Sequence, residues 1–375
     1  MNASTLHSID VSVLTPIARQ SVHRDTFSIQ GWQVSQLGGG VGNPVSLGLY
    51  RFEGTGQDQD EYIPWSVVLK IIQSPANAGW VNLGEGDDQT HWNYWKREPL
   101  VYQSGWLDTL PGDITAPRCF GIAEMPGNII WLWLEDITDS YERAWPLDRY
   151  ALAARHLGQL NGIYLYERSL PSFPWWGRGR IQHSLGLVPW QTIPWEHPQV
   201  LARYPRSGKN SFQRMLVENE LFLTRLERLP QTICHGDTYP TNFMSRDLPT
   251  GVQQTVAFDW ALAGIGPVGA DLGQLVFGAQ NNLQEVSPIE VDKALFESYL
   301  DGLRDSGCKV ESQYIRFGYA AFAALQVGLF QVFLLGRGLE ESETVAEPAV
   351  ENSANLDCFE VIMAEEAYKL LETIR

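Results

Sequence analysis

The sequence predicts an α+β protein with two lobes, an N-terminal antiparallel β-sheet and a larger, mainly helical C-terminal lobe. Two patterns support this prediction. From Trp32 to Leu134, short apolar runs are separated by Gly-rich or polar turns, as in β-strands. Beyond Ser140, apolar residues recur at helical spacing over long stretches. We therefore expect an N-terminal extension (residues 1–26), a β-rich lobe (27–133) and a helical lobe (139–375), joined by residues 134–138.

The composition limits the class of protein. With 375 residues, the chain is long enough to bury a large core. Its net charge of −17 argues against a general binder of nucleic acid or anionic membranes. The charge permits a cationic partner, although a solvated acidic surface is the commoner cause. The four cysteines have neither zinc-site nor redox spacing, and the N-terminus lacks the features of a signal peptide, so we expect a cytoplasmic protein with reduced thiols.

One apolar stretch, Tyr319–Gly336, raises the question of a membrane span. It is short for a span and contains Gln326 and Gln331. We expect a buried core helix here and no membrane partner. Coiled-coil heptads are absent from the sequence, which leaves the oligomeric state open.

The β-rich lobe begins after residues 1–26, which show no strong period and which we expect to be loosely attached. Two strands flank the Gly-rich segment 38–42. There, Gly39 and Gly40 could let backbone N–H groups approach a nucleotide phosphate, and Ser46 could donate a further hydrogen bond. A plain tight turn uses the same residues, so both interpretations stay open.

A third strand contains Lys70 within the apolar run VVLKII. A buried charge is costly unless it is paired, so this lysine either contacts a charged partner or extends from an edge strand to water. A solvated loop containing Glu85 follows, and then a mainly helical segment that includes Glu98 and Pro99. Residues 117–122 and 129–134 form the last two predicted strands, around the turn MPGN.

The helical lobe opens with a long predicted core helix over residues 148–166, where His156 is expected to be structural. A loop rich in Pro, Trp and Gly follows, in which Trp175 and Trp176 either pack or line a substrate face. Residues 209–229 are predicted to be helical, and residues 288–375 to form three or four helices. The acidic segment Glu340–Glu351 is expected to be a solvated loop unless it borders a substrate pocket.

The richest stretch in polar chemistry is 231–260, QTICHGDTYPTNFMSRDLPTGVQQTVAFDW. Its apolar runs predict strands at 232–234 and 255–258, so Asp237 and Asn242 share a loop and Asp259 follows the next strand. This order matches the Asp and Asn of a kinase catalytic loop followed by a metal-binding Asp. Asn242 and Asp259 could supply oxygen ligands to Mg²⁺, and Asp237 could accept the proton of an attacking hydroxyl. Alternatively, these residues merely form turns in a β-hairpin.

The segments HGDTYPTN and FDWALAGIGPVGADL resemble the aminoglycoside phosphotransferase and choline kinase-like family, which has the protein-kinase fold. The resemblance extends from about Trp32 to the C-terminal helices and is most specific over residues 235–271. It implies ATP or GTP with Mg²⁺ between the lobes. Lys70 would hold the α- and β-phosphates and pair with Glu98, with Glu85 as the weaker substitute.

The same resemblance implies roles for several other residues. Residues 134–138 would form the hinge between the lobes, and backbone atoms of residues 134–137, including those of Glu135 and Ile137, would bind the adenine edge. His235 would support the catalytic loop, and Asp271 would anchor it unless Asp271 merely caps a helix. Regulated protein kinases usually have Arg where this chain has Gly236, so we expect no requirement for phosphorylation.

We expect a small-molecule kinase that transfers the γ-phosphate of ATP or GTP to a hydroxyl of a small acceptor, which the acidic composition hints is cationic. Within this class, inactivation of an antibiotic and metabolic or biosynthetic phosphorylation of a choline-, sugar- or amino-alcohol-type acceptor both remain open. A protein kinase is disfavoured by Gly236 and by the short segment between Asp259 and Asp271. A nucleotide-binding pseudokinase scaffold is disfavoured because it could dispense with Asp237.

Overall fold

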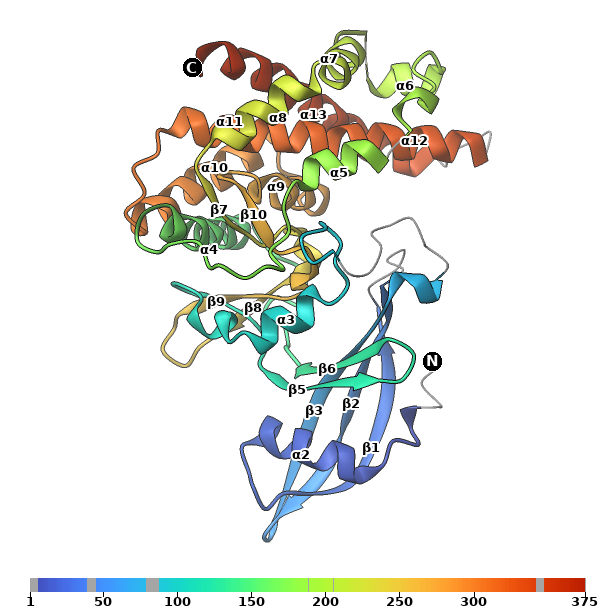
Figure 1. The fold of residues 1–375 in the computed structure, drawn as a ribbon, viewed down its shortest axis with the longest axis vertical. Helices are drawn as coiled ribbons and strands as arrows, with labels where there is room; N and C mark the ends of the chain where they lie inside the picture. Colours follow the sequence, from blue (N-terminus) through green and yellow to red (C-terminus); the bar gives the residue numbers. More distant parts are fainter. Residues whose placement is uncertain are drawn as a thin grey trace.

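A computed structural model describes residues 6–38, 45–78, 88–187, 189–204, 206–341 and 347–374, without the side chains of 187 and 337–358. The chain forms two lobes stacked along the long axis of the molecule, with the N-terminal sheet at one end and most helices at the other (Figure 1). The sheet has the order β1-β2-β3-β6-β5, and all its pairs are antiparallel. Its strands are β1 (Ser28–Leu37), β2 (Ser46–Asp58), β3 (Glu61–Gln73), β5 (Cys119–Met125) and β6 (Ile129–Glu135).

Strand β3 lies at the centre of this sheet and has two different faces. Because side chains alternate along a strand, Val67, Leu69 and Ile71 point to one side and Lys70 points to the other. The three apolar residues are buried in the core of the N-terminal lobe. Lys70, opposite Leu132 of β6, therefore faces the junction between the lobes.

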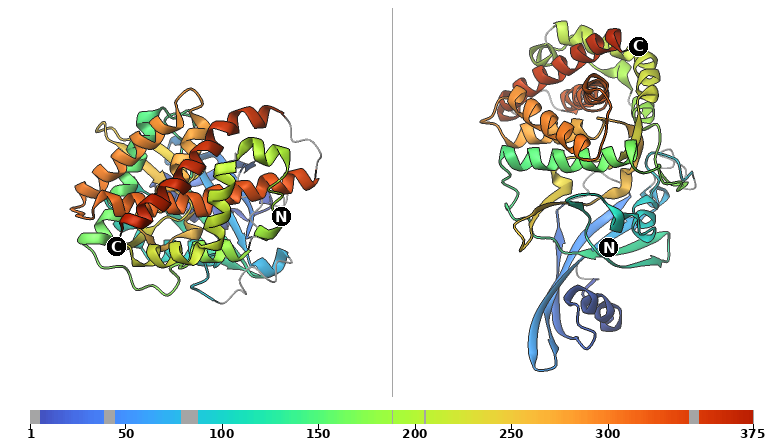
Figure 2. Two further views of the ribbon diagram at one scale, coloured as in Figure 1. Left: turned by 90° about the horizontal axis from the view of Figure 1, so that it is seen from above. Right: turned by 90° about the vertical axis from the view of Figure 1, so that its left-hand side faces the viewer.

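Helix α2 (Val11–Val22) covers the core face of the sheet (Figures 1 and 2). Its apolar residues Leu14, Ile17 and Ala18 are buried at helical spacing in the same core as β3. Asp10 caps the helix by accepting a hydrogen bond from the backbone N–H of Ser12 at 2.8 Å. The expectation that residues 1–26 are a loosely attached extension is therefore wrong for this segment.

Helix α3 (Arg97–Gln103) connects the sheet to the helical lobe. It is shorter than the predicted helical segment, and a 3₁₀ turn at Trp106–Thr109 follows it. Pro99 falls in the first turn of the helix, where its missing N–H leaves no helical hydrogen bond unmade. Pro99 is thus compatible with a helix that carries Glu98 on the side of the sheet.

The helical lobe is built around α4 (Leu147–Tyr166), which packs along α10 (Pro288–Asp305). The helices around this pair are α5 (Arg180–Leu187), α6 (Pro198–Arg203), α7 (Arg206–Val217), α8 (Asn219–Arg228), α9 (Leu272–Asn282), α11 (Ser312–Phe322), α12 (Leu329–Glu341) and α13 (Glu347–Thr373). A π-helical turn, Ala323–Gly328, joins α11 to α12.

Within the described ranges, Ser312–Gly336 is the one helical stretch that is long and apolar enough to cross a membrane. In its most apolar window, 72% of the residues are buried inside the protein. The neighbouring helices α9 and α13 pack against it. This is the environment expected for a core helix.

Two small sheets lie where the lobes meet. Strand β7 (Gln231–Cys234) pairs with β10 (Gly264–Pro267), and β9 (Gln253–Ala257) pairs with β4 (Ile114–Thr115) and with β8 (Phe243–Asp247). The loops that follow β7 and β9 carry the polar residues singled out in the sequence. Both loops are thereby brought to the underside of the helical lobe, facing β3 (Figure 1).

Candidate active site

The loop after β7 is held in place by Asp271, at the start of α9. Its carboxylate accepts the backbone N–H of His235 at 2.9 Å and that of Gly236 at 3.0 Å. Burial raises the pKa of Asp271 above its ordinary value, although these hydrogen bonds oppose the shift. The side chain of Asp271 makes no capping hydrogen bond to α9. Its contacts are therefore those of a loop anchor.

His235 links this loop to the end of β9. Its Nδ1 accepts the backbone N–H of Asp237 at 3.2 Å, which places the ring proton on Nε2. Nε2 then donates to the carbonyl of Phe258 at 3.1 Å. Burial lowers the pKa of His235 to about 4, so the ring is neutral near pH 7. His235 thus connects the two loops as a support and presents no acidic proton to a substrate.

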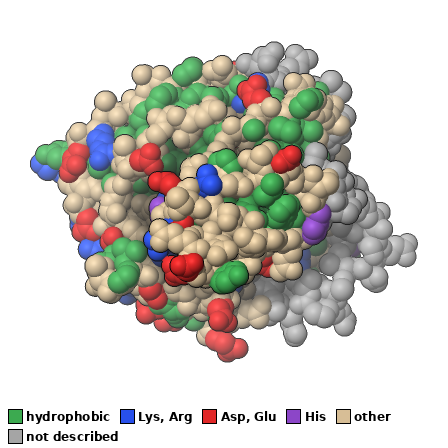
Figure 3. Space-filling view, turned by 90° about the horizontal axis from the view of Figure 1, so that it is seen from below, with side chains coloured by type: hydrophobic (Ala, Val, Ile, Leu, Met, Phe, Trp, Pro, Cys, Tyr) green, Lys and Arg blue, Asp and Glu red, His purple; other side chains and the backbone are tan. Residues whose placement is uncertain are grey.

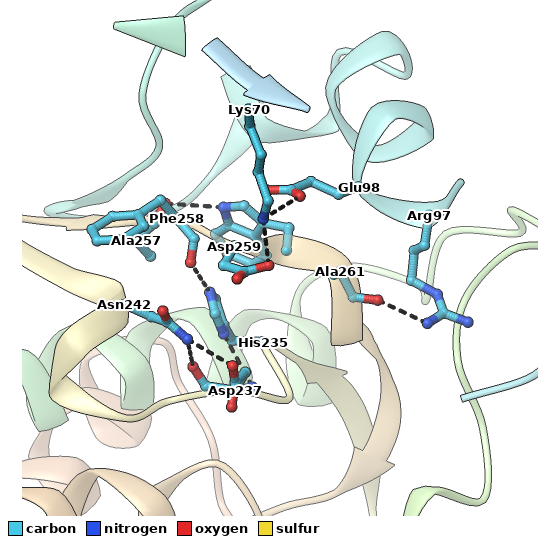
Figure 4. Close-up of polar contacts among 11 residues, drawn as sticks. Lys70, Arg97, Glu98, His235, Asp237, Asn242, Ala257, Phe258, Asp259 and Ala261 are labelled. Carbon is cyan, nitrogen blue, oxygen red and sulfur yellow. Dashed lines mark hydrogen bonds and ion pairs between the residues drawn. The ribbon is translucent and has the colours of Figure 1, made fainter. Parts of the chain in front are cut away.

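Asp237 and Asn242 contact each other across the loop, as Figure 4 shows. Nδ2 of Asn242 donates to the backbone carbonyl of Asp237 at 2.9 Å and to its carboxylate at 2.7 Å. Among the described residues, none donates to Oδ1 of Asn242, which leaves this oxygen available to a cation. Burial raises the pKa of Asp237, and the nearby charge of Arg180 opposes the rise.

Asp259 begins the second loop in a left-handed conformation, with φ 63° and ψ 63°. This conformation is uncommon outside glycine, although Asp tolerates it better than most residues. The Nζ of Lys70 lies 2.8 Å from Oδ1 of Asp259 and 2.6 Å from Oε2 of Glu98 (Figure 4). The three side chains, which come from β3, α3 and the second loop, form a charge triad of one ammonium and two carboxylates.

The three charges of this triad shift one another's pKa values. Burial alone would lower the pKa of Lys70, but the charges of Asp259 and Glu98 raise it above its ordinary value. Burial works to raise the pKa of Asp259, and the charge of Lys70 outweighs it, so the pKa of Asp259 is lowered. For the fully enclosed Glu98, burial prevails and raises the pKa to about 7. Lys70 therefore stays protonated beside an ionised Asp259.

A cavity of about 800 Å³ lies between the lobes at this triad. Its apolar walls come from both lobes, and Lys70, Asn242 and Asp259 stand at its polar side. The lining includes Leu49, Val68, Leu134, Glu135, Asp136, Ile137, Met244 and Phe258. Its volume and mixed lining are typical of a site for a nucleotide-sized ligand.

The predicted site residues divide into four groups. Asp237, His235 and Asp271 hold or belong to the loop after β7 and are not among the residues that line the cavity between the lobes. The structure brings Lys70, Glu98, Asn242 and Asp259 to one cavity, and Glu135 and Ile137 line the same cavity. Ser46 opens β2 outside the lining, with a buried hydroxyl that makes no hydrogen bond in the described part of the chain. Gly39, Gly40 and Glu85, as well as the side chains of Glu340–Glu351, lie outside the described residues.

Three arginines of the site region were not predicted. Arg51 pairs with Asp136 at 2.8 Å, and Arg143 donates to the carbonyl of Phe243 at 2.8 Å; both line the cavity. Arg97 is fully buried and donates to backbone carbonyls only, including those of Trp175 at 2.7 Å, Trp92 at 2.6 Å and Ala261 at 2.9 Å. No spacing in the sequence indicates these contacts, because most of them join segments that are distant along the chain; the contact of Arg97 with Trp92, five residues away, is local.

The tryptophans of the 168–180 loop are packing residues. Trp175 and Trp176 are buried, and their ring centroids lie 4.5 Å apart. Trp106 contacts the ring of Trp176 edge-on at 5.1 Å and that of Trp260 at 5.4 Å. Through Trp106, this cluster packs against Trp260, the residue that follows Asp259. None of these tryptophans lines the cavity between the lobes.

The described part of the chain contains no group of three or more His, Cys, Asp or Glu side chains that could hold a metal ion. Asn242 and Asp259 supply two oxygen ligands of the kind that Mg²⁺ prefers. A site for Mg²⁺ would thus need phosphate oxygens and water for its remaining ligands, as is usual for Mg²⁺ bound with a nucleotide. The donor set fits a magnesium–nucleotide complex better than a dedicated metal centre.

This fold and this site define a phosphotransferase that acts on hydroxyl groups. The chain belongs to the phosphotransferase enzyme family, whose family model matches residues 110–308. No curated protein gives a significant match. Solved structures with 13–14% sequence identity share the fold. They include an amicoumacin kinase, hAmiN (covering 99% of this chain and 96% of that chain, TM-score 0.50), and a choline/ethanolamine kinase family protein from Mesorhizobium loti (97% and 98%, TM-score 0.50).

A choline kinase from Cryptosporidium parvum is similar to the same extent, with 13% identity, 97% of each chain covered and a TM-score of 0.51. At such identities the likeness shows the fold alone. The predicted kinase-like α+β fold, the family resemblance and the small-molecule phosphotransferase class are confirmed.

Proposed function

We propose that the protein transfers the γ-phosphate of ATP or GTP to a hydroxyl group of a small acceptor, with Mg²⁺ as cofactor. The observation that carries the proposal is the charge triad of Lys70, Glu98 and Asp259 at the wall of the 800 Å³ cavity. Solved structures of the same fold support it. One is an amicoumacin kinase in complex with AMP-PNP and Ca²⁺, and others are choline kinases.

In the proposed mechanism, the backbone of residues 135–137 binds the base and Lys70 binds the α- and β-phosphates. Oδ1 of Asn242 and the carboxylate of Asp259 would hold Mg²⁺, which neutralises the phosphate charge when bound. Glu98 keeps the ammonium of Lys70 in position from the α3 side. Positioning and charge neutralisation supply most of the catalysis in this kind of reaction.

Asp237 is the proposed catalytic base. The amide of Asn242 fixes its carboxylate, and burial raises its pKa, which makes it a better proton acceptor than a solvated Asp. Asp237 would take the acceptor's hydroxyl proton as the new bond to the γ-phosphorus forms and the bond to the bridging oxygen of the nucleotide breaks. The first product is the phosphorylated acceptor and the second is ADP or GDP.

The first test is nucleotide consumption by the purified protein with ATP and GTP, against aminoglycosides, macrolides, choline-type amines, sugars and amino alcohols. With an acceptor that is turned over, Asp237→Ala should lower kcat by a factor on the order of 10² to 10⁴ and leave the Kd for the nucleotide nearly unchanged. Asp237→Asn, which keeps the side-chain shape, should be similarly impaired. If either variant kept most of the wild-type kcat, Asp237 would not be the base.

A further inference from the structure

A second cavity, of about 260 Å³, lies beside the catalytic loop on the side of α5 and α8. Its walls include Gly236 and Asp271 of the loop region, residues 264–267 that follow Asp259, and the apolar residues Leu223 and Leu226 of α8. The cavity therefore lies against both segments that carry the proposed catalytic and metal-binding carboxylates. Its volume suits a small molecule or one end of a larger one.

Arg180, at the start of α5, lines this cavity and has no partner among the described residues. Its Nε and Nη1 are enclosed and make no hydrogen bond, and no carboxylate of the described ranges lies within ion-pair distance. Arg180 is half-buried, and its two enclosed nitrogens are costly because their N–H groups lose water without gaining a hydrogen-bond acceptor. Arg180 thus presents unpaired N–H donors that an anionic ligand in the cavity could accept.

None of the other charged groups that line the cavity forms a hydrogen bond or an ion pair with Arg180 in the described part of the chain. Both oxygens of Asp271 already accept backbone N–H groups. The exposed Glu227 accepts a hydrogen bond from Gln182 at 3.0 Å, and Arg178 adds a second positive charge at the rim. The lining of the cavity thus contains two arginines and two carboxylates, and both carboxylates already accept hydrogen bonds from groups other than Arg180.

Arg180 also lies close enough to the catalytic loop to act on it. Its charge opposes the rise that burial causes in the pKa of Asp237, and it does the same at Asp271. Gly236, the residue before Asp237, lines the same cavity as Arg180, so an anionic group bound by Arg180 would lie near the loop that carries the proposed base. The same small molecule could present its anionic end to Arg180 and its hydroxyl to Asp237.

We propose that the 260 Å³ cavity is the acceptor subsite and that the acceptor carries a carboxylate or phosphate group, which Arg180 binds through charge-assisted hydrogen bonds. This inference rests on the proposed function and names its substrate class: a small hydroxylated anion. It replaces the cationic acceptor that the overall composition hints at. Figure 3 views the protein from the side of the N-terminal lobe and shows acidic side chains scattered among basic and apolar ones on the described part of that face.

The test compares three probes that share hydroxyl groups and differ in charge: glycerol, glycerate and glycerol 3-phosphate. The protein is first saturated with AMP-PNP and Mg²⁺, so that the anions cannot occupy the nucleotide cavity, and binding is measured by calorimetry. At least one anion should bind wild type about tenfold or more tightly than glycerol. The better anion identifies whether a carboxylate or a phosphate is preferred. If no anion is preferred over glycerol, the inference is overturned.

Matched variants assign the binding to the cavity. Arg180→Gln should weaken anion binding by about 10- to 100-fold and leave glycerol binding unchanged, while Arg180→Lys should retain part of the preference. Arg304→Gln removes an exposed arginine that pairs with Asp301 on α10, and it should behave as wild type. Equal loss in Arg304→Gln and Arg180→Gln would refute the assignment, as would unchanged anion binding in Arg180→Gln.

A kinetic measurement separates acceptor binding from a purely electrostatic effect on the loop. With an anionic acceptor that is turned over, Arg180→Gln should raise the KM for the acceptor and leave the pH profile of kcat nearly in place. A shifted pH profile with an unchanged KM would mean that Arg180 only tunes Asp237. Failure of AMP-PNP to bind wild type would count against the proposed function itself. Normal AMP-PNP binding without anion preference would count against the acceptor subsite alone.

Discussion

Gly236 offers the sharpest test of how closely the two site loops pack. The residue has φ +81°, and a Cβ built on it would lie 2.2 Å from the carbonyl oxygen of Leu262. Ordinary contacts begin at 3.4 Å, so Gly236→Ala requires the loops to move apart by more than 1 Å. Gly236 precedes Asp237, and Leu262 is three residues after Asp259. The substitution should therefore increase the distance between Asp237, the proposed base, and Asp259, the proposed metal ligand.

The magnitude has two parts. An Ala in the left-handed region costs about 1–2 kcal/mol of stability wherever it is placed. A displacement of about 1 Å among reacting groups costs on the order of 100-fold in rate, or about 2.7 kcal/mol in the activation barrier. We therefore expect Gly236→Ala to lower kcat by roughly 100-fold.

Gly251 is the matched control. It has φ +84° in the turn between β8 and β9, and a Cβ there would meet nothing within 4 Å. Gly251→Ala should therefore lose the same stability from backbone strain while keeping its kcat. Urea denaturation measures the free energy of unfolding of both variants, and nucleotide consumption with a saturating acceptor measures their kcat. If the kcat of Gly236→Ala lay within a few-fold of that of Gly251→Ala, the argument from loop packing would be refuted.

Three further predictions follow from the buried charges and the catalytic loop. Arg97→Ala leaves several buried carbonyls without a donor and should lower the free energy of unfolding by about 3 kcal/mol or more, measured by urea denaturation; a loss below 1 kcal/mol would contradict this role. Burial and nearby arginines lower the pKa of His156 to about 3. Below pH 6.5 the unfolded state therefore binds more protons than the folded state, and stability is lost as the pH falls. The His156→Gln variant should lose about 2 kcal/mol less than wild type between pH 7.5 and pH 5, and equal losses would contradict the prediction. Finally, the unphosphorylated recombinant protein should be fully active; a many-fold rise in kcat after treatment with a protein kinase would refute this.

Much of the site could be predicted because its members keep a fixed order along the chain. Asp237, Asn242 and Asp259 lie on two loops separated by predicted strands, and both loops are held where the pattern placed them. Pro99 directly after Glu98 argues against a helix that continues through both residues, so the sequence pattern alone supports the pairing of Lys70 with Glu98 only weakly. The structure places Pro99 in the first turn of α3, where proline is compatible with a helix.

Other elements could not be predicted for physical reasons. Helix α2 is short and contains Pro16, so its helical spacing of apolar residues is hard to recognise in the sequence. A capping residue, Asp10, followed by Leu14, Ile17 and Ala18 at helical spacing nevertheless indicates a helix. The contacts of Arg97 and the isolation of Arg180 arise from segments that meet only in the folded chain. A sequence shows that an arginine is present, but its partners depend on tertiary packing.

The local charges of the site are consistent with activity in the absence of a regulatory arginine beside Asp237, the proposed catalytic base. In the charge triad, Lys70 is already 2.6 Å from Glu98 and 2.8 Å from Asp259, with no phosphate group needed to hold them. One ammonium facing two carboxylates leaves a surplus of negative charge when both acids are ionised, which favours a divalent cation at Asp259. Gly236 has no side chain where the loop contacts Leu262, and the Cβ of an arginine at this position would clash with the carbonyl oxygen of Leu262. The close packing of Gly236 against Leu262, between the loops that carry Asp237 and Asp259, thus explains why no arginine occupies this position.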